Sequence, residues 1–179
     1  MAALTTPRIS RSIPAARHAA VVEQILALAA TDGHITARPA RSLRRALRDD
    51  RLVVAFDGEA VAFDGEAVVG WFLSEPCGPG VHELGFIFVH PSVRGDAVFI
   101  EMLNLALAIE GRAVSVTFRA DFAGWLIRSK GFRRVGLGEA TRLSRGWFLL
   151  RRLAPGRLGT ALRRTSSGEA WYLVYERPR

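Results

Sequence analysis

Cysteine is almost absent from this chain of 179 residues, in which Cys77 is the one example. A single cysteine excludes an intrachain disulfide and any metal site built from several thiolates. Cys77 lies in the stretch 75–80, whose prolines and glycines predict a loop, and no residue near it in the sequence is suited to act as its base. We therefore expect an incidental thiol rather than a nucleophile, in a protein of the reducing cytoplasm.

Long apolar runs are also missing, since none reaches the roughly 18 residues that a transmembrane helix needs. Residues 1–20 contain no acidic residue and no apolar stretch typical of a secretory signal. Their arginines suit either a transit peptide or a disordered basic arm, and we favour the arm. The sequence thus predicts a flexible arm over residues 1–13 and a single domain over residues 14–179, a length that can bury a core.

Lysine is also scarce, because Lys130 is the only lysine among the 25 basic residues and all the others are arginines. The formal net charge is +8. A GC-rich genome would produce this bias through its codons. A surface for phosphate or carboxylate groups would also use arginine, which binds them through two hydrogen bonds. Composition alone leaves both explanations open.

The spacing of apolar residues predicts two short helices before any strand. The first covers residues 14–30, and the second begins at Pro39 and places Leu43, Ala46 and Leu47 on one face. Asp121 is a candidate cap for a later helix that ends at Lys130, with Gly131 following it. We expect strands at 52–56, 67–73, 81–90, 114–118, 132–136 and 170–175, and helices at 97–110 and 121–130.

A tandem repeat interrupts the first pair of strands, because residues 55–61 recur unchanged as residues 62–68. A perfect copy is typical of a recent duplication. Its odd length of seven residues cannot be absorbed within one strand without moving side chains to the opposite face of the sheet. We therefore predict that one copy forms an extended or double turn, with a binding loop as the alternative.

Two stretches, together with the order of the elements, resemble the GNAT (N-acetyltransferase) superfamily. Residues 83–95, ELGFIFVHPSVRG, are similar to the family's central strand and the start of its pyrophosphate loop. Residues 123–132, AGWLIRSKGF, resemble the helix that precedes its penultimate strand. The resemblance implies an α/β (α+β) fold with a mixed, mostly antiparallel central sheet flanked by helices. It also implies acetyl-CoA as a co-substrate and transfer of its acyl group to an amine.

In this family the backbone N–H groups of the loop and the helix N-terminus bind the CoA pyrophosphate, and the central strand pairs with the pantetheine arm. Carried onto this sequence, the resemblance implies a cofactor-binding set of Phe88, Val89, Arg94, Gly95, Asp96, Ala97 and Val98.

The loop departs from the family pattern at three positions. Ala97 replaces a glycine, and Phe99 replaces a small residue where the backbone should approach the phosphate. Asp96 adds a negative charge there, which repels phosphate. The ring of Phe99 would block the site unless a local shift turns it into the core. The tyrosine that many members use to protonate the leaving thiolate is also absent, because Ile127 holds its position.

Glu83 is the catalytic candidate, as a carboxylate on the central strand near the expected amine. It could equally be an exposed glutamate with no role. His82 and His90 flank the same strand and are more typical of satisfied polar residues, while Tyr172 and Tyr175 suit packing in the last strand. No serine–histidine–aspartate arrangement and no metal-ligand spacing is present, so we expect no metal site.

Residues 140–168 form an arginine-rich insertion with seven arginines and no acidic residue. It could be a solvated lid with a few apolar anchors, a surface for an acidic partner, nucleic acid or the CoA phosphates, or a short amphipathic segment on an anionic membrane. We expect that deletion of residues 142–165 leaves the core folded.

Two functions remain open at this stage. One is an acyl-CoA-dependent N-acyltransferase, acting on an amine of a small molecule or a protein. The other is a catalytically inactive protein of the same fold that binds an acidic partner or nucleic acid through its arginines. A plain nucleic-acid-binding domain is a weaker third alternative, because the basic residues are dispersed and no recognised nucleic-acid-binding module is present.

Overall fold

The computed structural model describes residues 7–32, 35, 38–57, 66–93, 96–109, 111–152 and 170–176. The chain divides into two compact units. The first unit comprises residues 1–74 and 86–109, and the second comprises residues 75–85 and 110–179. The expectation of a single domain over residues 14–179 stays a prediction.

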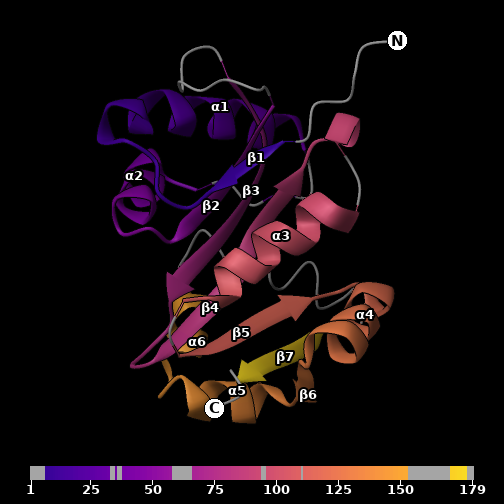
Figure 1. Ribbon diagram of the computed structural model, residues 1–179. Helices are drawn as coiled ribbons and strands as arrows, with labels where there is room; N and C mark the ends of the chain where they lie inside the picture. Colours follow the sequence, from indigo (N-terminus) through magenta and orange to yellow (C-terminus); the bar gives the residue numbers. More distant parts are fainter. Residues whose placement is uncertain are drawn as a thin grey trace. The chain divides into compact units, whose positions relative to one another are not determined.

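Helices and strands alternate in the order expected for a mixed fold (Figure 1). The strands form one sheet in the order β1-β2-β3-β4-β5-β7-β6. The pair β4–β5 is parallel, and the pairs β1–β2, β2–β3, β5–β7 and β6–β7 are antiparallel. The predicted fold class is therefore confirmed. The elements are β1 (Arg8–Ser10), a 3-10 turn (Ala15–Arg17), α1 (His18–Thr31), α2 (Ala40–Arg48), β2 (Leu52–Asp57), β3 (Ala67–Pro76), β4 (Val81–Val89), a second 3-10 turn (Pro91–Val93), α3 (Asp96–Leu107), β5 (Arg112–Thr117), α4 (Ala120–Lys130), β6 (Arg133–Val135), α5 (Leu137–Leu143), α6 (Trp147–Arg152) and β7 (Trp171–Glu176).

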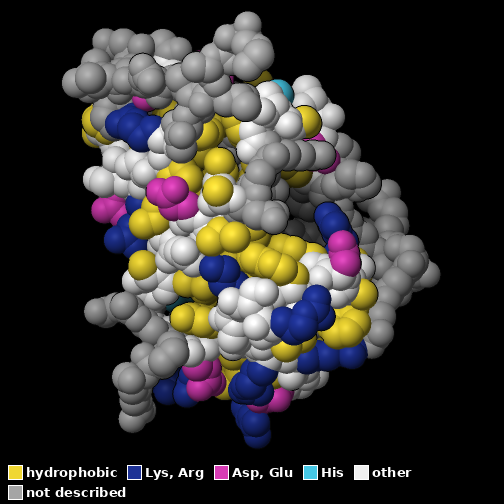
Figure 2. Space-filling view, turned by 45° about the vertical axis from the view of Figure 1, so that its right-hand side comes forward, with side chains coloured by type: hydrophobic (Ala, Val, Ile, Leu, Met, Phe, Trp, Pro, Cys, Tyr) yellow, Lys and Arg dark blue, Asp and Glu magenta, His cyan; other side chains and the backbone are white. Residues whose placement is uncertain are grey.

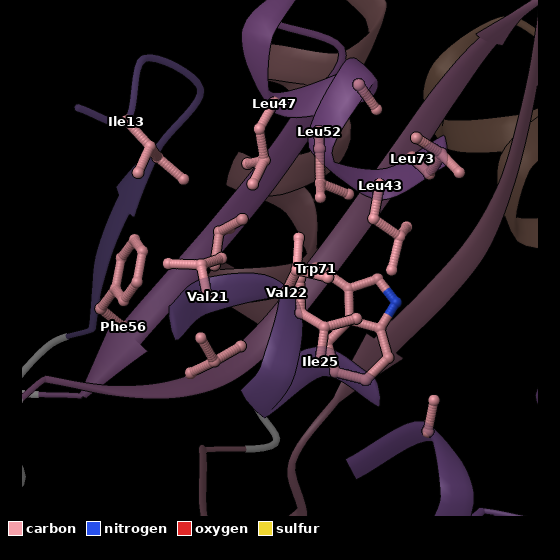
Figure 3. Packing of buried hydrophobic residues seen from close by; sticks show 14 residues of the cluster. Ile13, Val21, Val22, Ile25, Leu43, Leu47, Leu52, Phe56, Trp71 and Leu73 are labelled. Atoms are coloured by element: carbon pink, nitrogen blue, oxygen red, sulfur yellow. The ribbon is translucent and has the colours of Figure 1, made fainter. Parts of the chain in front are cut away.

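The core of the first unit lies between the helices α1 and α2 and the strands β2 and β3. Figure 3 shows Val22 and Ile25 of α1 next to Trp71 of β3, and these three side chains are at most 1% exposed. Alternate residues of β2 also enter this cluster, because successive side chains of a strand point to opposite faces.

The opposite face of β2 is covered by α3, so every residue of β2 from Leu52 to Phe56 is buried. Gly70 of β3 makes this packing possible. A Cβ atom at Gly70 would lie 3.1 Å from the carbonyl oxygen of Phe88 and 3.3 Å from the terminal methyl group of Met102. The glycine therefore lets β4 and α3 approach β3 closely.

The N-terminal residues differ from their prediction where the structure describes them. Arg8–Ser10 form β1, which pairs with β2 in the register Arg8↔Phe56 to Ser10↔Val54. The guanidinium of Arg8 donates to the carboxylate of Glu66 at 2.8 Å, and Ile13 is buried in the core. Backbone pairing, an ion pair and apolar burial thus hold residues that the sequence predicted to be a flexible arm.

The second unit contains β5, β7 and β6, with α4, α5 and α6 around them. Its core includes Cys77, Val81, Val114 and Val174, and the ring of Phe148, which is fully buried. Phe148 belongs to the arginine-rich insertion, whose first part forms α5 and α6. The expectation that deletion of residues 142–165 leaves the core folded is therefore revised, since the deletion would remove a buried phenylalanine.

The end of α4 follows the sequence prediction, and its start does not. Gly131 has a left-handed φ of 72°, and its N–H and that of Phe132 both donate to the carbonyl of Leu126. The N-cap residue is Arg119 rather than Asp121. Asp121 lies in the first turn, where its carboxylate accepts a hydrogen bond from Arg119 at 2.6 Å.

The tandem repeat begins in β2 and ends in β3. The two strands pair from Leu52↔Leu73 to Asp57↔Ala67, with a shift in register between Ala55 and Phe56. Residues 58–65, which include the turn predicted to absorb the extra copy, lie outside the described residues.

Candidate functional site

The strand β4 changes its surroundings at Phe86, which has a φ of 51°. A positive φ strains a residue with a Cβ atom, and strain of this kind is concentrated at functional sites. Before Phe86, residues Val81–Leu84 pair with Arg112–Ser115 of β5. After it, the ring of Phe88 stacks on Trp71 of β3 at 4.6 Å. The candidate base and the candidate cofactor-binding residues of this strand thus lie on either side of a strained residue.

Glu83 is half-buried, and its backbone partner in β5 is Val114, which in turn pairs with Val174 of β7. Val114 and Val174 both belong to the core that contains Phe148. Because residues paired across strands project to the same face, Glu83 lies on the face of the second unit that carries Phe148. Glu83 is thus half-buried rather than exposed, and its role as a base stays a prediction.

Phe88 and Val89 are both half-buried at the end of β4. The next residue, His90, donates its backbone N–H to the carbonyl of Val69 at 2.7 Å. Its imidazole Nδ1 lies 2.7 Å from the hydroxyl of Ser92. His90 is therefore a partnered polar residue, as the sequence suggested, while a role for Phe88 and Val89 in binding a cofactor stays a prediction.

The helix α3 begins at Asp96, one residue earlier than predicted and inside the stretch 94–99 that resembles the family's loop. Ala97 is exposed and Val98 is buried. Arg94 and Gly95 lie outside the described residues, as does the side chain of Asp96. The first N–H groups of a helix lack intrahelical partners and attract anions, so the start of α3 can interact with a phosphate.

Phe99 is half-buried and packs against the face of β3 that α3 covers. Its ring lies 6.1 Å from the ring of Phe72 of β3, which is 2% exposed. The sequence predicted that this phenylalanine would obstruct the phosphate site unless it rotated into the core, and the structure places it in the second arrangement. The ring of Phe99 therefore packs on β3.

An aromatic cluster that the sequence analysis did not predict surrounds the end of β4. Phe86 lies 5.5 Å from Trp71, and the guanidinium of Arg38 lies 5.7 Å from the centre of the Phe86 ring. The alternation of phenylalanines at 86 and 88 was visible in the sequence. Arg38 precedes α2 and is distant in sequence, so only the fold reveals the contact.

The two tyrosines of β7 pack against phenylalanines, as predicted. The ring of Tyr172 lies 6.0 Å from that of Phe148, and the ring of Tyr175 lies 5.3 Å from that of Phe132. Ile127 of α4 is half-buried and supplies no proton. Within the described residues, no group of three or more histidine, cysteine, aspartate or glutamate side chains could hold a metal ion.

Several arginines of the second unit are neutralised by acidic neighbours. Hydrogen bonding to Arg119 lowers the pKa of Asp121, and hydrogen bonding to Glu139 raises that of Arg133. Arg112 lies 3.3 Å from Glu176. On the face shown in Figure 2, basic side chains repeatedly lie next to acidic ones. These pairs are exposed, so they contribute little to stability.

Comparisons with known proteins find matches among solved structures, and none among family models or curated proteins. A structure of Rv2747 from Mycobacterium tuberculosis in complex with CoA matches with a TM-score of 0.57 and 16% identity, over 96% of this chain and 100% of that chain.

Two further solved structures match over nearly the whole chain. The NatC complex bound to Gag peptide and CoA has a TM-score of 0.59 at 11% identity, over 97% of this chain and 100% of the matched chain. A GNAT-family acetyltransferase from Bacillus cereus has a TM-score of 0.56 at 12% identity, over 97% of this chain and 99% of its own. At these identities the likeness shows a common fold.

Proposed function

We propose that this chain, which has the fold of the GNAT superfamily, transfers an acyl group from an acyl-CoA thioester to an amine. Solved proteins that share this fold carry CoA, including the Mycobacterium tuberculosis protein and the NatC complex. A shared fold does not fix function, so the proposal depends on the site. Acetyl-CoA is the donor that the resemblance favours.

The observation that carries the proposal is the start of α3 at Asp96, directly after β4 and its 3-10 turn. This arrangement offers helix N–H groups to the pyrophosphate at the position where the sequence resembles the family's loop. The orientation of Phe99 toward Phe72 supports the same conclusion, because it keeps the ring against the core. Both observations support the binding of an acyl-CoA at this position.

The chemistry requires two proton transfers. The amine must lose a proton before or as its nitrogen attacks the thioester carbonyl, and we assign the acceptance of that proton to the carboxylate of Glu83. The new amide bond forms as the carbon–sulfur bond breaks, and the CoA thiolate leaves with the electron pair. Since Ile127 has no proton to give, we propose that the thiolate is protonated by solvent. Holding the two reactants together supplies much of the rate enhancement.

The acceptor is an amine of a small molecule or a protein, and we place the reaction in the cytoplasm, where the buried thiol of Cys77 would remain reduced. The second candidate function is an inactive protein of this fold that binds an acidic partner. Ile127 at the position of the family's tyrosine is the observation that favours it.

The test is a thermal-shift titration with acetyl-CoA and, as a companion, desulfo-CoA. A ligand that binds only the native state raises the melting temperature in a saturable way, by an amount that grows with the ratio of its concentration to Kd. We expect such a rise with both ligands, followed by acetylation in a screen of amines. Absence of a shift at millimolar ligand would contradict the proposal and support the inactive binding protein.

A further inference from the structure

The short helix α6 exposes three large apolar side chains to solvent. Trp147 is 53% exposed, Leu149 is 40% exposed and Leu150 is 61% exposed. Among the described residues only Phe118 and Leu137 share this combination of size, hydrophobicity and exposure. Single exposed apolar residues are common, but a cluster within one helical turn marks a surface that contacts a protein or a membrane.

The orientation of these side chains is fixed by the residue between them. Phe148 is fully buried in the core of the second unit, and its N–H donates to the hydroxyl of Ser144 at 3.0 Å. Trp147 and Leu150 lie three positions apart and so are neighbours on the helix surface. With Phe148 directed inward, the helix cannot turn its exposed side chains into the core without losing that burial.

Unpaired basic side chains precede this apolar cluster. Arg142 and Arg145 are exposed, and neither has an acidic partner among the described residues. Other arginines of the same unit do have one, such as Arg119 with Asp121 and Arg133 with Glu139. The sequence from 140 to 168 contains no acidic residue that could neutralise the segment.

We propose that residues 142–150 form a docking surface for an anionic lipid bilayer. Trp147, Leu149 and Leu150 enter the boundary between headgroups and acyl chains, and Arg142 and Arg145 bind lipid phosphates. This combination of exposed tryptophan and leucine with arginine is the one that interfacial segments use. No helix among the described residues is long and apolar enough to cross a bilayer.

The composition of the surface favours a lipid bilayer over other partners. Nucleic acid would engage the arginines through its phosphates, but it gives no role to two exposed leucines. Energetically dominant residues of protein interfaces are enriched in tryptophan and arginine, while leucine is under-represented among them. A bilayer accommodates all of these side chains at once, because its acyl chains accept the leucines and its phosphates accept the arginines. This proposal is independent of catalysis.

The experiment is co-sedimentation of the full-length protein with sucrose-loaded vesicles. One set contains phosphatidylcholine alone, and the other contains about one third phosphatidylglycerol, which supplies a negative surface. We expect binding to the anionic vesicles that weakens with salt, and little binding to the neutral ones. We expect the double variant W147S/L150S and the double variant R142Q/R145Q each to lower the partition coefficient about tenfold.

The matched charge control is R41Q/R44Q on α2, which removes two exposed arginines that also lack an acidic partner among the described residues. The matched apolar control is Phe118→Ser, since Phe118 is 37% exposed. Both controls should bind vesicles as the wild type does. Circular dichroism and thermal melting confirm that each variant is folded.

Four results would overturn the proposal. The first is a wild-type protein that does not bind the anionic vesicles. The second is loss of binding in R142Q/R145Q with unchanged binding in W147S/L150S, which would indicate a surface for polyanions such as nucleic acid. The third is an equal loss in R41Q/R44Q, which would show that net charge alone causes adsorption. A monomer–dimer shift abolished by W147S/L150S, without vesicle binding, would instead identify a second copy of the chain as the partner.

Discussion

The rings of Phe99 and Phe72 pack against each other with their centres 6.1 Å apart. Phe72 is buried in β3 and Phe99 is in the first turns of α3, so the contact helps to attach α3 to the sheet. A residue that departs from the family pattern in sequence therefore has a packing role in the structure. Its effect on ligand binding and its effect on stability can be separated by experiment.

Phe99→Ala should lower the free energy of unfolding by about 2 kcal/mol, because it deletes a half-buried ring from a packed contact. Urea denaturation measures this loss. We expect the thermal shift produced by acetyl-CoA to remain, since the ring packs against Phe72 of β3. A larger shift in the variant than in the wild type would show that the phenylalanine obstructs the ligand.

The elements from α1 to β6 could be predicted in order, because apolar residues recur at helical spacing in the helices and form short runs in the strands. The helices α5 and α6 were not predicted. The left-handed conformation of Gly131 was also predictable, because a glycine that follows the last residue of a helix commonly adopts it. The strand β1 was not predicted, since Arg8 is held by Glu66, 58 positions away in the sequence. The burial of Phe148 was not predicted either, because nothing local distinguishes its buried ring from the exposed Trp147 beside it.

At the candidate site, the sequence predicted the start of α3 to within one residue, and it predicted which strand carries Glu83. It could not predict the orientation of Phe99, which depends on the position of Phe72 in another element. The contact of Arg38 with Phe86 was also beyond prediction, because it joins the residue before α2 to a strained position in β4. Long-range packing decides these features, whereas local periodicity decides the elements.

Phe148 and Trp147 offer a matched pair of adjacent aromatic residues. Phe148→Ala should destabilise the protein by about 3–5 kcal/mol, because it leaves a cavity in the core of the second unit. Trp147→Ala should change the free energy of unfolding by no more than about 0.5 kcal/mol, since the side chain is largely exposed. Equal effects of the two substitutions in chemical denaturation would contradict the burial described for Phe148.

The ion pair between Arg8 and Glu66 should couple β1 to the rest of the first unit. The side chain of Glu66 is 1% exposed, so Arg8→Met would leave a buried carboxylate without its partner and destabilise the protein by about 2–3 kcal/mol. The double variant R8M/E66M should recover most of that loss, because it removes the buried charge. A double-mutant cycle from urea denaturation measures the coupling, and strictly additive effects would contradict it.

Gly78 and Gly80 both have a positive φ, of 104° and 64°, but they differ in the space around them. A Cβ atom at Gly78 would lie 2.5 Å from the carbonyl oxygen of Ser144, whereas one at Gly80 would meet no atom within 4 Å. Gly80→Ala should therefore cost only the backbone penalty of about 1 kcal/mol. Gly78→Ala should cost clearly more, because the backbone at Ser144 must move. Equal melting temperatures for the two variants would contradict this difference.

Glu83→Gln tests the assignment of the general base without changing the size of the side chain. If the carboxylate accepts the proton of the ammonium group, the neutral amide should lower kcat by about a hundredfold or more. The thermal shift with acetyl-CoA should be unchanged, because Glu83 is assigned to the amine and not to the CoA. Initial rates of amine acetylation, measured with the amine that the screen identifies, give the comparison.

His90→Gln is the control for this substitution, because His90 flanks the same strand and is the competing base. Its imidazole already pairs with Ser92, so removing it should leave kcat close to the wild-type value. A loss confined to His90→Gln would transfer the role of base to the histidine. A loss of the acetyl-CoA thermal shift in Glu83→Gln would instead show that the glutamate shapes the cofactor site. Only a fall in kcat with intact ligand binding assigns the proton transfer to Glu83, because it separates chemistry from binding.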